Sequence, residues 1–201
     1  MSIEKLKKDI GGIDIYLLDQ ILKGRYQSKD LILDAGCGTG RNLKWFYDNS
    51  FSCFGVDANA SSIKKAQEKY PNLSGNFSVQ NLDVLNFEDH TFEHVICSAV
   101  LHFAQNTLHF LNMFSELVRV VKVNGTIFVR MTSIQGMAEF VHQIYEGVYS
   151  LPDKTNRFLV HEEIIFKIME KHNLSFLEPI KTVQVGKERS MCTLMFKKNE
   201  Y

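Results

Sequence analysis

The sequence predicts an α/β fold of the Rossmann-like kind, in which a mostly parallel sheet is covered by helices on both faces. Three observations support this class. Short β-type runs alternate with helical periods along the chain, which is typical of parallel sheets with crossover helices. A cluster of glycines follows the first apolar run, in LILDAGCGTGRN (31–42). Two further runs end on acidic residues, Asp57 and Asp83.

The central elements follow from hydrophobic periodicity. Strands are expected at 31–35, 53–57, 77–83, 94–99 and 126–131, and helices at 42–49, 61–70 and 107–121. In the last helix one stripe is apolar and the opposite stripe is polar, so one face should be buried and the other solvated. The apolar stripe comprises Leu108, Leu111, Phe114, Leu117, Val118 and Val121.

The flanking segments extend the same fold. Residues 13–22 carry an apolar face, which predicts a helix packed across the body of the protein. Beyond Gly136, helical stretches are expected at 137–150 and 161–171. Two β-type runs follow, at 176–185 and 191–197, and the turn-like residues 186–189 would join them as an antiparallel pair.

Composition limits the functional classes. The 201 residues are 45% hydrophobic, which is enough for a single domain with a substantial core. The 23 basic and 23 acidic residues cancel, so the cationic surface typical of nucleic-acid binding is not expected and a small or neutral partner is favoured. The chain carries neither a secretion signal nor a run of membrane-spanning length. A cytoplasmic protein is therefore expected, without a membrane partner.

The four cysteines, Cys37, Cys53, Cys97 and Cys192, are widely scattered and include no Cys-x-x-Cys pair. We expect free thiols in a reducing compartment rather than a zinc or redox centre.

The glycine cluster lies where open α/β sheets bind their ligands, outside the carboxyl ends of the strands. A glycine carries no Cβ, so Gly36, Gly38 and Gly40 indicate either a tight turn or a ligand close to the backbone. The helix expected from residue 42 directs its free N–H groups at the same crevice, which favours an anionic group there.

Acidic residues end three successive strands. Asp57 follows Gly40 by 17 residues, about the separation at which a carboxylate meets the ribose of a nucleotide. At the end of the third strand, Asp83 is placed to accept a proton from an exocyclic amine, and Val84 to give a backbone contact to an adenine ring. A ligand-free turn is the alternative for the glycines, and a turn or cap is the alternative for Asp83.

Five blocks together are similar to the class I S-adenosylmethionine-dependent methyltransferases. They are LILDAGCGTGRN, FGVDAN, QNLDVL, FEHVICSAVLHF and LVRVVKVNGTIFV, in this order, and they cover roughly residues 31 to 133. The Gly-Arg-Asn ending resembles small-molecule members, including the tellurite-resistance type. The resemblance implies a seven-stranded sheet with an antiparallel last strand, and S-adenosylmethionine as cofactor. It divides the single domain (1–201) into an N-terminal helical cap (1–30), a cofactor-binding core (31–133) and C-terminal helices with antiparallel strands (134–201).

The resemblance also implies roles for individual residues. The three glycines would line the methionine part, Asp57 would hold the ribose and Asp83 the adenine. Arg41 is the expected partner of the cofactor carboxylate, and residues 98–102 would run beneath the sulfonium. The full set of expected cofactor residues is Asp34, Gly36, Cys37, Gly38, Gly40, Arg41, Asn42, Asp57, Ala58, Asp83, Val84, Ser98 and Ala99.

One departure from related enzymes narrows the acceptor. Methyltransferases acting on nitrogens of proteins and DNA commonly carry Asn/Asp-Pro-Pro-Tyr/Phe after the fourth strand, whereas this chain has SAVLHF. A small-molecule acceptor is therefore favoured, with oxygen, nitrogen, sulfur and metalloid acceptors and the oligomeric state left open. Two other functions compete. A non-catalytic protein that binds S-adenosylmethionine would show the same blocks. A nicotinamide-dependent reductase would show G-x-G-x-x-G and Tyr-x-x-x-Lys, which are not present.

Candidate chemistry outside the cofactor blocks rests on few residues. His102 is expected either as a general base titrating near neutral pH or as a pocket wall beside Phe103. His109 is expected on a solvated helix face. Tyr16, Arg157 and Arg189 are substrate candidates, since the arginines can grip an acidic group by bidentate bonds or serve only as solubilising charges. No metal is expected, because no cluster has ligand spacing.

Overall fold

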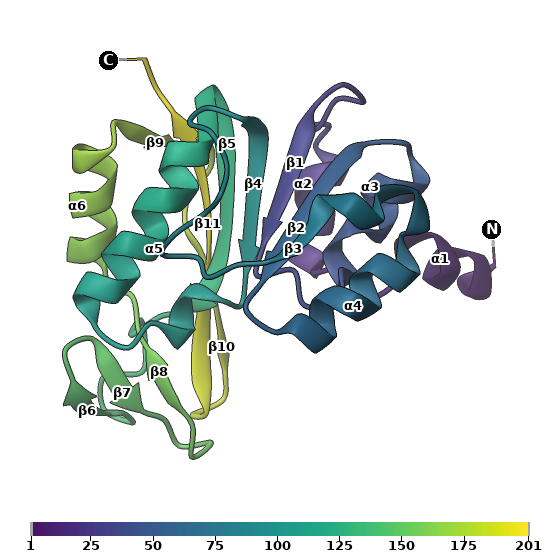
Figure 1. Cartoon of the computed structure of the whole chain (residues 1–201). Helices are drawn as coiled ribbons and strands as arrows, with labels where there is room; N and C mark the ends of the chain where they lie inside the picture. The colour runs from purple at the N-terminus through teal and green to yellow at the C-terminus, as the bar shows by residue number, and fades with distance from the viewer. Residues whose placement is uncertain (1, 201) are drawn as a thin grey trace.

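The computed structural model describes residues 2–200, and its strands lie in two sheets (Figure 1). The strands of the main sheet are β1 (Leu31–Ala35), β2 (Ser52–Asp57), β3 (Phe77–Val79), β4 (Phe92–Ser98), β5 (Val121–Thr132), β9 (Leu174–Phe176), β10 (Lys181–Val185) and β11 (Arg189–Lys198). Their order is β10-β11-β5-β4-β1-β2-β3, and β9 pairs with β11 beside this path.

The sheet has the predicted strand directions. Strands β1 to β5 run parallel, while β11 runs antiparallel to β5 and to β10. The prediction of a seven-stranded, mostly parallel sheet with an antiparallel last strand is confirmed, and the short β9 adds an eighth strand at the side. The buried strands β1 and β4 are apolar along most of their length because both faces of the sheet are covered.

Helices cover both faces of the sheet. They are α1 (Ile3–Ile10), α2 (Ile15–Leu22), α3 (Lys44–Asp48), α4 (Ala60–Lys69), α5 (Thr107–Val120) and α6 (Glu162–Lys171). Figure 1 shows α5 and α6 on one side and α3 and α4 on the other. Two separate apolar cores match these sides. Successive residues of β1 alternate between them, since Ile32 packs toward α2, α3 and α4 while Leu33 packs toward α5 and α6.

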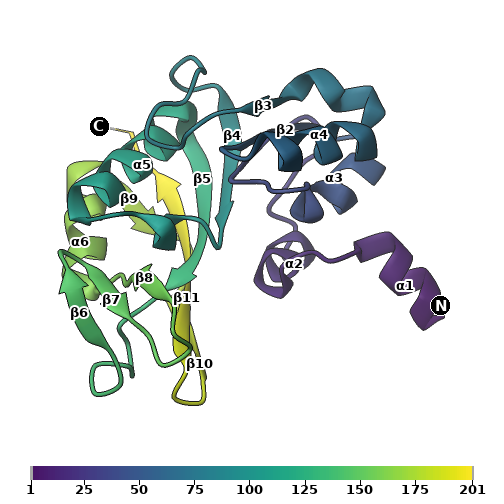
Figure 2. The same cartoon turned by 60° about the horizontal axis from the view of Figure 1, so that its bottom comes forward.

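The N-terminal segment contains two helices instead of one. Helix α2 confirms the helix expected at 13–22, and it is capped by Asp14, whose Oδ1 accepts the Tyr16 N–H at 2.9 Å. Helix α1 was not expected from the sequence. It buries no residue, and Figure 2 shows it projecting from the rest of the protein. Across residues 2–200, every helix is too short or too polar to span a bilayer.

The helix expected at 137–150 is wrong. That region forms a second, antiparallel sheet of β6 (His142–Tyr145), β7 (Val148–Ser150) and β8 (Asn156–Phe158). Gly147 turns the chain between β6 and β7 at φ +75°, and a Cβ there would lie 2.2 Å from the Phe158 ring. A helix cannot continue through a left-handed turn that is packed against an aromatic ring. The apolar residues of this stretch therefore lie on strands.

Other details also differ from prediction. The strand expected at 77–83 ends at Val79, because the Gln80 N–H bonds the Asp57 carbonyl and the chain then turns. The run expected at 176–185 is divided into β9 and β10 around Pro179, which cannot donate a ladder hydrogen bond. In α5, Leu108 is 66% exposed, because the buried stripe includes Phe110 and Met113 in its place.

Candidate active site

The glycine loop joins β1 to a 3-10 turn at Arg41–Leu43. Gly36, Gly38 and Gly40 all have positive φ, at +83°, +54° and +73°. The loop is bonded to β2, because the N–H groups of Gly36 and Cys37 both donate to the Val56 carbonyl, at 2.8 and 2.9 Å. Such a backbone suits glycine, since an L side chain in the left-handed region costs about 1–2 kcal/mol.

The three glycines have different neighbours. A Cβ on Gly36 would lie 2.3 Å from the Val100 side chain, and one on Gly40 would lie 2.6 Å from the Tyr70 ring. A Cβ on Gly38 would meet nothing within 4 Å. Gly36 and Gly40 are thus required by packing within the protein, whereas Gly38 faces open space. The packing explanation therefore holds for Gly36 and Gly40, and the ligand explanation stays a prediction for Gly38.

A cavity of about 730 Å³ opens beside this loop, and we call it the large cavity. Its walls come from the loop after β1, the end of β2, the loops after β3 and β4, and the start of α5. These are the carboxyl ends of neighbouring parallel strands, where α/β sheets bind ligands. Its volume lies within the range of about 300–1,000 Å³ typical of small-molecule sites.

Asp57 connects the cavity wall to the glycine loop. Its Oδ2 accepts the Gly38 N–H at 2.9 Å and its Oδ1 accepts the Asn59 N–H at 2.8 Å. A carboxylate has about four lone-pair positions, so each oxygen retains capacity for a further donor such as a ribose hydroxyl. Asp57 therefore both fixes the loop and lines the cavity.

Five of the expected cofactor residues line the large cavity: Gly36, Asp57, Ala58, Asp83 and Ala99. The eight that lie outside its lining are Asp34, Cys37, Gly38, Gly40, Arg41, Asn42, Val84 and Ser98. Several of these bond other groups of the protein, Arg41 and Val84 among them. The Arg41 guanidinium donates to the Gly12 carbonyl at 3.0 Å, and the Val84 N–H donates to the Asn81 carbonyl at 3.3 Å.

Asp34 is buried directly beneath the loop. Both of its carboxyl oxygens are buried, and neither has a hydrogen-bond partner among residues 2–200. Burial raises the pKa of Asp34 to about 7, and the nearby Asp57 adds to this effect while Arg41 opposes it. The carboxyl group of Asp34 thus lacks a partner beneath the loop, but it is fully buried and lies outside the lining of the large cavity.

A polar cluster behind the loop was missed by the sequence analysis. Its centre is Asp14, whose backbone N–H donates to Asn42 Oδ1 at 3.0 Å. Asp14 Oδ2 accepts from Ser98 Oγ and from Arg130 Nη1, both at 3.1 Å. The available signal was the Asp that precedes α2, which looks like an ordinary helix cap. Its long-range partners on β4 and β5 depend on the tertiary fold.

A second cavity, of about 290 Å³, lies between β10, β11 and the small sheet, and we call it the arginine cavity. Three arginines line it: Arg130, Arg157 and Arg189. The structure thus brings two predicted substrate residues together and adds Arg130, which was not predicted. Tyr16 is outside the lining, because its ring packs against the Arg130 guanidinium, 5.1 Å from the ring centroid.

Ala99 lines both cavities. It follows β4 directly and has φ +62°, which is uncommon for a residue with a side chain. Its N–H donates to the Arg130 carbonyl at 2.7 Å, which holds the strained position in place. The two cavities therefore meet at one residue at the carboxyl end of the sheet.

His102 lies in the wall of the arginine cavity. Its ring packs edge-on against Phe103, at 4.6 Å between centroids, and its buried Nδ1 has no partner within the described chain. Burial, together with the charges of Arg157, Arg130 and Arg189, lowers the pKa of His102 to about 4. This lowered pKa argues against the expectation of a value near neutrality, because a cationic imidazole would be desolvated among guanidinium groups.

His109 differs from its expected position on a solvated helix face. It is half-buried and lines the large cavity, with Nδ1 accepting the Gln105 N–H at 3.2 Å. Other polar residues of this cavity were also missed: Asn81, Gln105, Asn106 and Asn112. Asn81 lies in the QNLDVL block after β3, whereas the other three carry no motif and come from α5 and the residues just before it. Among residues 2–200, His, Cys, Asp and Glu form no group of three or more with metal-binding geometry.

Comparisons with known proteins agree with this geometry. Residues 33–129 match the family described as "Methyltransferase domain". This match covers just under half of the chain, and the fold is that of the class I S-adenosylmethionine-dependent methyltransferases. The matched segment of this methyltransferase spans the glycine loop, Asp57, Asp83 and Ala99. No curated protein matches the chain.

Solved structures share the fold over almost the whole chain. An S-adenosylmethionine-dependent methyltransferase from Clostridium acetobutylicum has a TM-score of 0.73 at 14% identity, covering 98% of this chain and 95% of that one. One from Methanosarcina mazei has a TM-score of 0.71 at 20% identity, covering 90% and 98%. The PH0226 protein from Pyrococcus horikoshii has a TM-score of 0.69 at 20% identity, covering 98% and 92%. At these identities the likeness establishes the fold.

S-adenosylmethionine is the cofactor of this methyltransferase, and the residues present fit it. The large cavity adjoins the glycine loop, where Gly38 leaves open space. Asp57 presents a carboxylate from the end of β2, and Asp83 presents an exposed one from the loop after β3. These are suitable acceptors for ribose hydroxyls and for an exocyclic amine.

Proposed function

We propose that this methyltransferase acts on a small molecule by in-line displacement, with the donor in the large cavity and the acceptor in the arginine cavity. The observation that carries the proposal is the contact of the two cavities at Ala99. A reaction between two bound molecules needs their reacting atoms about 3–3.5 Å apart, so donor and acceptor would have to meet beside Ala99, the residue that both cavities share.

The cofactor supplies an electrophilic methyl group on a sulfonium, and in the transfer an acceptor lone pair bonds the methyl carbon while the carbon–sulfur bond breaks and its electron pair stays on sulfur. The chain's own residues bind and align. Asp57 would hold the ribose and Asp83 the adenine amine. The polar cluster around Asp14 would fix the glycine loop to β4 and β5 through Ser98 and Arg130. Alignment of this kind can supply a large part of the acceleration.

A metabolite-extract screen tests the proposal. Purified protein is incubated with cofactor carrying an isotopically labelled methyl group, and the labelled small molecules are identified. Transfer of label to a small molecule is the expected result. Calorimetry with S-adenosylhomocysteine and with NADH separates the alternatives. Binding of S-adenosylhomocysteine without label transfer would indicate a non-catalytic binder, and binding of NADH alone would indicate a reductase.

The unpaired cysteines suggest the compartment. All four are buried and form no disulfide within residues 2–200. This matches the expectation of free thiols and supports a cytoplasmic location, because reducing compartments keep thiols unpaired.

A further inference from the structure

We propose that the arginine cavity selects a small anionic acceptor, with a carboxylate or phosphate group held by Arg157 and Arg189 and an apolar body held by the β10–β11 pair. This inference rests on the proposed methyl transfer and names the class of its substrate. It is argued from the charges, the unpartnered atoms and the apolar wall of the cavity.

The cavity carries an excess of positive charge. Arg130 is neutralised by Asp14, at 3.1 Å, but no carboxylate among residues 2–200 lies within 4.0 Å of Arg157 or Arg189. Asp153 is the one acid in the lining, and its Oδ1 is engaged by the N–H and the hydroxyl of Thr155 at 2.9 and 2.6 Å. Two guanidinium groups thus lack an ion-pair partner within the described chain.

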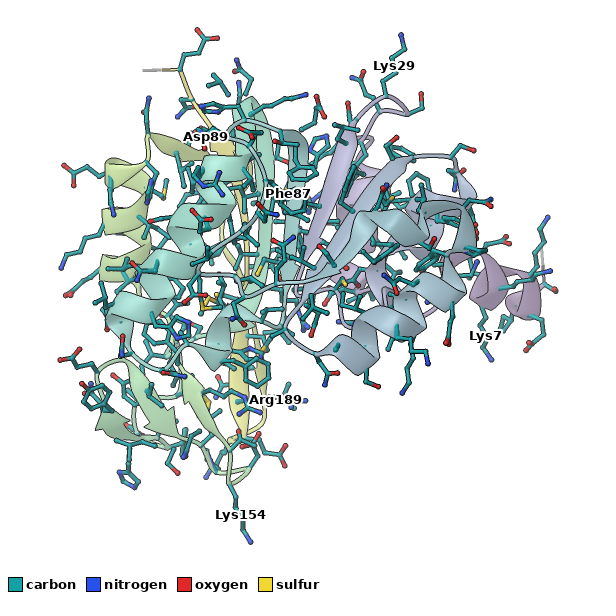
Figure 3. The ribbon with its side chains drawn as sticks, in the orientation of Figure 1. Lys7, Lys29, Phe87, Asp89, Lys154 and Arg189 are labelled. Carbon is teal, nitrogen blue, oxygen red and sulfur yellow. The ribbon has the colours of Figure 1, made fainter. Side chains whose placement is uncertain are left out.

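The two arginines are positioned by different elements. Arg157 lies on β8, and its guanidinium stacks on the Phe103 ring at 4.8 Å from the centroid. Arg189 begins β11, at the lower end of the β10–β11 pair in Figure 3. Phe103 lines the large cavity, so Arg157 also marks the border between the cavities. An anion bridging two separate elements is fixed in orientation, which is what planar guanidinium groups provide.

Buried atoms in the same wall also lack partners. Arg130 Nε and His102 Nδ1 are both buried without a hydrogen bond within residues 2–200. Buried polar groups in folded proteins are nearly always paired, so each such atom calls for a partner. Arg130 Nε is a donor and His102 Nδ1 can donate or accept, so both suit an oxygen-rich ligand. The pKa of His102 is lowered mainly by burial, and the charges of Arg157, Arg130 and Arg189 contribute in the same direction.

Part of the remaining lining is apolar and the space is small. Leu151, Val183, Val185 and Met191 line the cavity together with the polar Thr132 and Thr155, and Val183 and Val185 are exposed in part. Exposed valines beside unpaired arginines suit a ligand with one charged end and one apolar end. The volume of about 290 Å³ restricts that ligand to a small molecule.

A paired acceptor library tests the charge requirement. Carboxylates are offered beside their amides and phosphates beside their parent alcohols, with cofactor carrying a labelled methyl group. Label confined to the anionic members is expected, and its distribution between carboxylates and phosphates identifies the anion. Equal or preferential labelling of the neutral members would overturn the inference while leaving the proposed function standing. No label on any member or on a metabolite extract would overturn the proposed function itself.

Direct binding gives a test that does not depend on turnover. Phenylacetate, phenyl phosphate and the neutral phenylacetamide are titrated by calorimetry into protein saturated with S-adenosylhomocysteine. An anion is expected to bind at least about tenfold more tightly than the amide, because it meets two unpaired guanidinium groups. Arg157→Gln with Arg189→Gln should remove this preference while S-adenosylhomocysteine affinity stays within about twofold.

Lys154→Gln is the matched control. Lys154 lies in the same segment and carries the same charge, but it is exposed, lies outside the cavity lining and points away from the protein (Figure 3). The control should keep the preference for anions. The inference is overturned if the wild type shows no preference for either anion, or if the lysine variant loses it to the same extent as the double arginine variant.

Discussion

Asp57 performs two tasks at the scale of a single residue, and they can be separated by substitution. Asp57→Ala removes a charged acceptor of the ribose hydroxyls and also the bond that holds the Gly38 N–H at 2.9 Å. We expect a loss of about 2–4 kcal/mol in S-adenosylhomocysteine binding, or about 30- to 900-fold in Kd by calorimetry. Asp57→Asn keeps one oxygen for the loop and should lose less. An unchanged Kd in the alanine variant would contradict the ribose assignment.

Gly38 and Gly40 form a matched pair, since both have positive φ and differ in what surrounds them. Gly38→Val places its side chain in open space, so it should block cofactor binding and lower the melting temperature only by the cost of the left-handed backbone. Gly40→Val should in addition disrupt Tyr70, which stacks on Phe77, and lower the melting temperature much further. Calorimetry and thermal melts check both. Equal destabilisation by the two variants would indicate that Gly38 also serves only the turn.

His102 has a pKa lowered to about 4, so it is a weak base at neutral pH. With an identified acceptor, His102→Gln should reduce single-turnover methyl transfer only a few-fold, compared with about 10²–10⁴-fold for loss of a general base. The rate profile of the wild type should contain no histidine step between pH 6 and 7. A fall of about 100-fold together with the loss of such a step would show that the bound acceptor restores the basicity of His102.

At the scale of elements, His94 connects three neighbouring strands by hydrogen bonds. Its Nε2 bonds Asp30 Oδ2 at 2.9 Å, just before β1, and its Nδ1 bonds Thr126 Oγ1 on β5 at 2.7 Å. Burial lowers the pKa of His94, and this effect outweighs the opposing effect of Asp30. The folded state therefore favours the neutral ring, in which one nitrogen donates and the other accepts.

The sign of the pH effect follows from this lowered pKa. His94 contributes stability that is present above its unfolded pKa of 6.5 and is lost as the pH falls from there toward the lower folded value. His94→Gln should cost about 1–3 kcal/mol in unfolding free energy at pH 7.5, through lost buried hydrogen bonds. The cost should shrink toward pH 5, measured by urea unfolding of both proteins. Other titrating groups, including Asp34, cancel in the difference. A cost that grows toward pH 5 would mean that Asp30 raises the pKa of His94.

The sequence predicted the strands whose apolar residues follow a clear pattern between turns. It failed for elements whose structure depends on contacts with residues far away in the chain. The strands β1, β2, β4 and β5 have apolar runs between clear turn signals, so their positions are confirmed within a few residues. The small sheet was misjudged because residues 137–150 have an apolar period without the turn chemistry that Gly147 and the Phe158 ring impose. Leu108 was expected in the core because an apolar stripe on a helix does not show which of its residues face the sheet.

At the scale of the whole molecule, the two cavities differ in how far a linear sequence describes them. Asp57, Asp83 and the glycines follow strand ends in a known spacing, so the sequence alone predicted a ligand site where the large cavity lies. The arginine cavity joins β5, β8 and β11, whose arginines lie 27 and 32 positions apart. The sequence indicated two of these arginines as candidates, but only the pairing of β11 with β5 and the fold of the small sheet bring them together.

Cofactor binding should stabilise the whole fold, because residues from both halves of the parallel sheet line the large cavity. A ligand that binds only the folded state stabilises it by about 2.7 kcal/mol at 100 times its Kd. For a domain of this size each kcal/mol raises the melting temperature by about 2–4 °C, so S-adenosylhomocysteine should give about 5–11 °C. NADH at the same concentration should give no shift, and Asp57→Ala at that concentration should lose most of the shift given by S-adenosylhomocysteine. Equal shifts from both ligands would contradict the assignment of the large cavity, because a general stabilising solute needs neither Asp57 nor the glycine loop.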